Sequence, residues 1–124
     1  MRDFIQILLD FLVAEGSIVG DPQKDIILDE PDRATAIYET TPVPTPAIAR
    51  SQVRSFQVVC RSSYDQSFND SWNCHDSLDA DDGSGIITID GSDYKFVLGT
   101  PFKLKKDEQQ RTYFAFNLNV SVPK

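Results

Sequence analysis

The sequence predicts an α+β fold, a mainly antiparallel sheet of four to five strands with two helices packed on one face. Residues 112–122 alternate apolar and polar side chains, which is typical of a long strand with one buried face. Residues 2–15 and a segment that starts at Ser63 carry apolar side chains at helical spacing. One helix and two strands, then one helix and three strands, form the element order expected of an α+β domain.

The first predicted helix, residues 2–15, has a broad apolar face. Its stripe consists of Phe4, Leu8, Phe11 and Leu12, widened by Ile5, Ile7 and Leu9. Gly16 follows at the position of a left-handed helix cap. A face this wide must cover a sheet, or a sheet together with a neighbouring subunit.

A connector, residues 17–33, separates this helix from the first predicted strand. Asp21-Pro22 and Glu30-Pro31-Asp32 are turn sequences, and residues 26–28 allow a short extended piece. Residues 34–40, Ala-Thr-Ala-Ile-Tyr-Glu-Thr, are then predicted to form a strand.

The loop at residues 41–52 is rich in proline. Proline fixes φ and extends the residue before it, so a stiff, polyproline-like arm is expected that cannot join a central strand. Two interpretations stay open: a long hairpin connection, or an arm that reaches a neighbouring molecule. The interface residues predicted here are Pro42, Val43, Pro44, Thr45 and Pro46.

The middle of the chain predicts a central strand at 53–61 and then the second helix. Ser63 and Gln66 fit a capping box at the start of that helix. One helix face, expected to pack on the sheet, carries Tyr64, Phe68, Trp72, His75 and Leu78.

The C-terminal part predicts an acidic turn from Asp79 to Gly85 and then two short strands, 85–90 and 94–99. Asp90-Gly91 between them is a hairpin signal. Residues 103–111 are charged and predict a loop tip or bulge before the last strand.

Composition limits the classes of function. With 124 residues, the chain is expected to form a single domain, residues 1–124. A net charge of −7 argues against non-specific nucleic-acid binding. It is compatible with a channel surface along which DNA moves without binding, because such a surface should itself be negative. Two isolated cysteines predict buried free thiols, and the first residues lack a signal peptide or membrane span, so synthesis in the cytoplasm and no membrane association are expected.

No catalytic, cofactor-binding or metal-binding residue is predicted. His75 is the only histidine, and Asp79, Asp81 and Asp82 do not fit the spacing of a calcium loop. Two cysteines and one histidine cannot complete a structural zinc site. The basic cluster at the tip is expected to be solvated, or else to contact an acidic partner; it consists of Lys103, Lys105, Lys106 and Arg111.

A series of short segments in a fixed order runs through almost the whole chain, and none of them is a catalytic signature. The segments are Asp3 to Leu12, Glu15-Gly16, Leu28 to Arg33, Ala36 to Thr40 with the prolines that follow, Phe56 to Arg61, the Tyr64 helix, Thr100-Pro101-Phe102, Asp107-Glu108 and Tyr113 to Val120. In this order the segments resemble the minor capsid or tail-terminator family of long-tailed bacteriophages. The stretch from Asn73 to Asp79 is less aliphatic than the family pattern.

This resemblance implies a structural virion protein without enzymatic activity or cofactor. The expected assembly is a homo-oligomeric ring, usually hexameric, that ends the tail tube on the head-proximal side. Its expected partners are the tube protein and the head connector, with DNA passing through the lumen. The Pro42–Pro46 arm and the Lys103–Arg111 tip are the expected contact elements.

Other functions stay open at this stage. A head-completion or neck connector protein on the portal side would have the same composition. An acidic host-directed binding protein would be a monomer with a basic partner. A small hydrolase would require His75 or a pair of carboxylates in a pocket.

Overall fold

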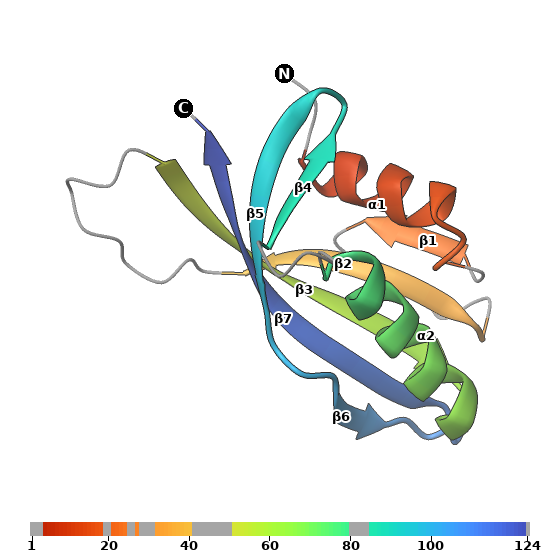
Figure 1. Ribbon diagram of the computed structural model, residues 1–124. Coiled ribbons are helices and arrows are strands. Elements are labelled where there is room, and N and C mark those ends of the chain that lie inside the picture. The colour runs from red at the N-terminus through yellow and green to blue at the C-terminus, as the bar shows by residue number, and fades with distance from the viewer. Residues whose placement is uncertain are drawn as a thin grey trace.

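The computed structural model describes residues 4–18, 21–24, 27, 32–40, 51–79 and 85–123. Within these residues, seven strands form one curled sheet in the order β1-β2-β3-β7-β5-β4, and β6 also pairs with β7 (Figure 1). The elements are α1 (Phe4–Ala14), β1 (Asp21–Lys24), β2 (Ala34–Thr40), β3 (Ser51–Ser62), α2 (Tyr64–Ser77), β4 (Ile86–Ile89), β5 (Ser92–Leu98), β6 (Phe102–Lys106) and β7 (Thr112–Pro123).

The predicted fold class, an antiparallel sheet of four to five strands, is wrong. The observed sheet is mixed, because β1 pairs with β2 in parallel, and β6 adds a further strand beside β7. Both missed strands lack the usual pattern: β1 begins with Asp-Pro, and every residue of β6 is exposed. Pairing with a neighbour, rather than sequence preference, makes these segments extended.

The centre of the sheet is the antiparallel pair of β3 and β7. The pairing runs from Ser51 opposite Pro123 to Ser62 opposite Thr112. The predicted strands at 53–61 and 112–122 are therefore confirmed within two residues. Alternate side chains of the pair point to one face and are almost fully buried there; they are Phe56, Val58, Cys60, Phe114, Phe116, Leu118 and Val120.

Both helices cover that same face of the sheet (Figure 1). The stripe of α1 is buried at Phe4, Leu8 and Leu12, and the Phe4 ring lies 5.3 Å from the ring of Phe56. Gly16 has φ of 75°, which confirms the predicted left-handed cap.

Helix α2 begins as predicted, and the predicted face packs on the sheet in part: Leu78 is buried, and the rings of Phe68 and His75 lie 5.5 and 5.6 Å from those of Phe114 and Phe116. The hydroxyl of Ser63 accepts a hydrogen bond from the Gln66 backbone N–H at 3.4 Å, which confirms the cap. The residues against the sheet are small, with the larger Leu78 just after the helix; they are Ser67, Ser71 and Cys74. Small side chains allow a close approach, so the aromatic residues lie along the flank. Tyr64 is 56% exposed and Phe68 42% exposed.

An ion pair also fastens α2 to the sheet. Arg33, just before β2, donates to both carboxylate oxygens of Asp70, at 3.0 and 2.8 Å. The hydrogen bond to Asp70 raises the pKa of Arg33, although burial opposes the shift. A bidentate pair of this kind fixes orientation as well as distance.

Phe116→Ala is expected to lower the free energy of unfolding by about 3–5 kcal/mol, because the ring is fully buried between β7 and the helices. Val97→Ala, at a residue that is 58% exposed, is the control and should cost at most about 1 kcal/mol. Urea denaturation of the two variants measures both values. Equal stability of the two variants would contradict the position assigned to Phe116.

Candidate interface surfaces

The two helices pack on one face of the sheet only. On the opposite face a smaller buried cluster, formed by Val59, Tyr113 and Ala115, lies beside exposed side chains. Register places Val97 opposite Asn119 and Phe102 opposite Ala115, so these side chains point away from the helices. Four large apolar side chains on this face are more than one third exposed, namely Ile86, Val97, Phe102 and Leu104. We call this surface the helix-free face.

The middle of the helix-free face is polar but uncharged. Ser55 donates to the Asn119 side-chain oxygen at 2.6 Å, and Gln57 donates to the Asn117 side-chain oxygen at 3.1 Å. These pairs bridge β3 and β7 across the central ladder. The side-chain amides on this face already form hydrogen bonds with each other, and apolar side chains are exposed beside them. Burying such a surface in a contact with another molecule therefore costs little desolvation free energy.

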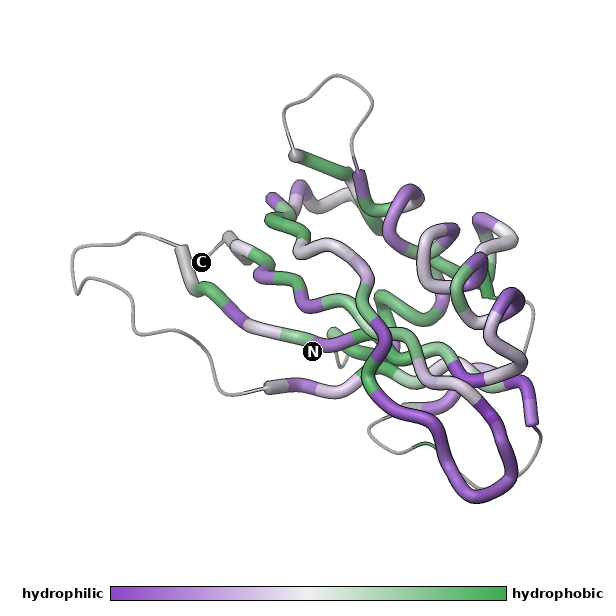
Figure 2. The backbone as a smooth tube through the Cα atoms, turned by 90° about the horizontal axis from the view of Figure 1, so that it is seen from below, coloured by the Kyte–Doolittle hydropathy of each residue, from purple (hydrophilic) through white to green (hydrophobic). Residues whose placement is uncertain are grey.

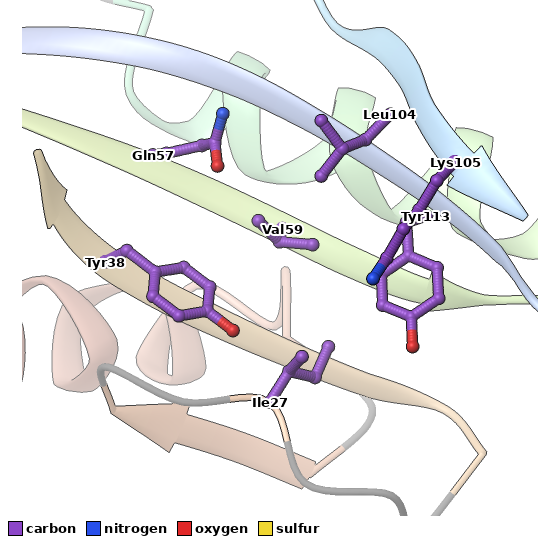
Figure 3. Close-up of a pocket in the computed structure, with 7 residues that line it drawn as sticks. All are labelled: Ile27, Tyr38, Gln57, Val59, Leu104, Lys105 and Tyr113. Carbon is purple, nitrogen blue, oxygen red and sulfur yellow. The ribbon is translucent and has the colours of Figure 1, made fainter. Parts of the chain in front are cut away.

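A pocket lies on the helix-free face where β2, β3, β6 and β7 come together. Its volume is about 170 Å³, and Figure 3 shows Val59 between the side chains of Tyr38 and Tyr113. The complete lining is Ile27, Tyr38, Gln57, Val59, Leu104, Lys105 and Tyr113. The pocket is smaller than the roughly 300–1,000 Å³ typical of sites for drug-sized ligands, so its size suits one or two side chains better.

A group of buried charges closes one end of this face. Arg111 is only 8% exposed; its Nε donates to Asp107 at 2.8 Å, and another guanidinium nitrogen reaches Asp32 at 3.3 Å. Arg61, 1% exposed, donates to the Asp32 carbonyl oxygen at 3.0 Å and lies over the Tyr113 ring. These arginines therefore hold the β6–β7 turn and the start of β2 together.

The structure separates the predicted basic cluster into two parts. Lys103, Lys105 and Lys106 are exposed on β6, and Figure 2 shows the β6–β7 hairpin in the colour of hydrophilic residues. Arg111 instead points inward to the carboxylates described above. A register shift between Lys103 and Lys105 brings the Lys105 amine to 4.7 Å from the Tyr113 ring centre. The predicted contact residues 42–46 lie outside the described residues.

Asp107 organises the turn between β6 and β7. One carboxylate oxygen accepts from the backbone N–H groups of Gln109 and Arg111, at 3.0 and 2.9 Å. The other accepts from the Arg111 guanidinium and from the Tyr113 hydroxyl. Partial burial raises the pKa of Asp107, but these hydrogen bonds outweigh it, so its pKa lies below the ordinary 3.8.

The histidine and the two cysteines, which carry the side chains most often used in catalysis, pack against other residues of the domain. The His75 ring lies edge-on to Trp72 and Phe116, and its Nδ1 is 3.1 Å from Asp76. Cys60 and Cys74 are free and buried, and a hydrogen bond with Cys60, together with burial, raises the pKa of Cys74. Across the described ranges, no cluster of three potential metal ligands is present.

Sequence reasoning missed the pocket because its lining comes from separate segments. Tyr113 lies on the mostly polar side of the predicted strand 112–122, and Tyr38 and Val59 lie on two other predicted strands. That these three residues are neighbours on one face becomes clear only once the strand register is known.

The architecture defines a small sheet domain with both helices on one face. The chain belongs to the bacteriophage tail terminator family, whose sequence model matches residues 16–123. It is therefore a structural protein of the phage tail and a component of the virion. Among the described helices, none has the length and apolar character needed to span a membrane.

Comparison with solved structures gives a distant similarity. A crystal structure of a protein from Akkermansia muciniphila matches with a TM-score of 0.41 and 8% sequence identity. The match covers 73% of this chain and 42% of the other, so the chain spans less than half the length of that protein. No curated protein matches the sequence.

Asp107→Asn is expected to reduce the acid sensitivity of the fold. Because the pKa of Asp107 is lower in the folded chain than in the unfolded chain, the unfolded state binds more protons below about pH 4. The stability that Asp107 contributes is therefore present above this range and lost as pH falls through the folded pKa. Thermal unfolding between pH 6 and pH 3 measures the effect.

The fall in Tm over that interval should be smaller for Asp107→Asn than for the wild type. Glu108→Gln removes the same charge from the adjacent position and serves as the matched control, which should follow the wild type. An Asp107→Asn profile parallel to that of the wild type would show that the network around Arg111 is not coupled to pH.

Proposed function

We propose that this protein is the tail terminator itself, a ring that ends the tail tube on its head-proximal side and joins the tail to the head. The observation that carries the proposal is the family match over residues 16–123. In this role the protein stops addition of tube subunits and presents a surface to the head connector. It catalyses no reaction and requires no cofactor.

The distribution of charge supports assembly from identical copies. Along α1 and α2, the charged side chains other than His75 are carboxylates, and exposed ones include Asp10, Asp65 and Asp76. The exposed lysines of β6 lie at the edge of the sheet. A closed ring needs two different patches that fit each other, and opposite charges favour such a contact.

The contact elements proposed for the ring are the Pro42–Pro46 segment and the lysines of β6. We infer a hexamer of this chain with the tube protein on one side and the head connector on the other. DNA crosses the lumen without specific binding, as the net charge of −7 favours.

Virions assembled without the gene test this function. Loss of a terminator removes the stop to tube polymerisation, so tails of uncontrolled and excessive length are expected in electron micrographs. Wild-type protein supplied in trans should restore a uniform length. Tails of normal length beside filled or empty unjoined heads would contradict the proposal and place the protein on the head side of the junction.

A further inference from the structure

A polar hollow lies where the C-terminal ends of the two helices meet. Its volume is about 440 Å³, and its lining comes from the last residues of α2 and from those that follow α1; they are Glu15, Gly16, Ser17, Asn73, Asp76 and Ser77. The hydroxyls of Ser17 and Ser77 share a hydrogen bond, so the two helix ends are held together at the hollow. We call this surface the polar hollow.

The polar hollow favours a positively charged ligand. The carboxylates of Glu15 and Asp76 line it, and the Asp76 side chain is 69% exposed. The C-terminal end of a helix carries a partial negative charge, and both helices end here. The last turn of α1 has no basic residue, and the last turn of α2 has His75 alone, whose Nδ1 lies 3.1 Å from Asp76. Among the described lining residues, none is a lysine or an arginine.

The chain offers a matching positive surface on β6. Lys103, Lys105 and Lys106 are exposed within four consecutive positions. The arginines of the described ranges instead bind acceptors of their own chain, as Arg33 binds Asp70. The three lysines are therefore the densest group of exposed positive charges in the part of the chain that the structure describes.

We propose that the polar hollow of one copy binds the β6 lysines of a second copy. Each copy has a net charge of −7, so two copies repel each other unless a basic surface of one meets an acidic surface of the other. The two surfaces differ, so such contacts join copies head to tail, as a ring requires. The inference rests on the proposed ring, which brings a neighbouring copy within reach.

The lysines of β6 cannot occupy the polar hollow of their own copy. Lys103 lies opposite Phe114, whose ring contacts Tyr64 and Phe68 in the first half of α2. Even Phe68 is nine residues from Ser77, about 13 Å along the helix axis. The strands beneath α1 include β1 and β2, those beneath α2 are β3 and β7, and β6 lies beyond β7 (Figure 1). Helix α2, roughly 10–12 Å wide, therefore also stands between β6 and the end of α1.

Reversal of charge on the full chain tests this contact. One variant reverses the hollow, Glu15→Lys with Asp76→Lys, and a second reverses β6, Lys103→Glu with Lys106→Glu. Lys105 is kept because its amine lies over the Tyr113 ring. In either variant alone the two surfaces carry charge of the same sign, whereas in a mixture of the two variants every contact pairs opposite signs.

The readout is cross-linking with a carbodiimide, which joins an amine directly to a carboxylate in contact with it. It is applied to the purified chain at high concentration and to virions. Wild type should give covalent oligomers whose linked peptides join Lys103, Lys105 or Lys106 to Glu15 or Asp76. Each variant alone should give several-fold less product, and the mixture should restore it.

The matched control reverses two exposed carboxylates of the same helices outside the hollow, Asp10→Lys with Asp65→Lys. It changes the net charge by the same amount as the hollow variant, and by itself it should cross-link as the wild type does. Unfolding temperatures close to that of the wild type establish that every variant is folded.

The proposal is overturned if the mixture gives no more product than its components, or if the control loses product to the same degree. Linked peptides of β6 and the hollow confined to the monomer would place the lysines on their own copy and also overturn it. Oligomers joined only at other residues, or no oligomers in either sample, would reject this contact. Tail length in virions without the gene is the separate measurement that decides the terminator function.

Discussion

The rest of the structure depends on the pairing of β3 with β7 along their whole length. This pair supplies the apolar floor on which both helices pack, including Phe56 and Phe116. It also gives every other strand its place, because β2 attaches to β3 while β5 and β6 follow each other along β7. Both helices cover the same side, so the opposite face carries only the small cluster of Val59, Tyr113 and Ala115 and a set of exposed side chains.

The elements with a strong local pattern could be predicted from the sequence. Alternation identified β7, and the caps at Gly16 and Ser63 identified helix ends, because these signals depend on neighbours along the chain. Strands β1 and β6 could not be found this way, since each is extended by pairing with a distant strand. The buried face of α2 could be predicted in part, since Leu78 is buried and the rings of Phe68 and His75 contact β7. The small residues of this face, such as Ser67 and Ser71, were missed because they add little to a hydrophobic pattern.

The candidate contact surfaces could be predicted only in part. Composition identified the lysines of β6, but the role of Arg111 depends on Asp107 and on the distant Asp32, which the fold brings to it. The pocket could not be predicted from the sequence. Strand register alone brings together the residues that line it, among them Tyr38, Val59 and Tyr113. Family membership makes this chain a structural protein of the phage tail.

The proposed function requires that copies of this domain close into a ring at one end of the tail. Cryo-electron microscopy of purified tails, with symmetry determined at each tip and with antibody labelling of this chain, would detect such a ring. A closed ring of this chain is expected at the head-proximal tip only. Label distributed along the tube, or a head-proximal tip without density for this chain, would contradict it.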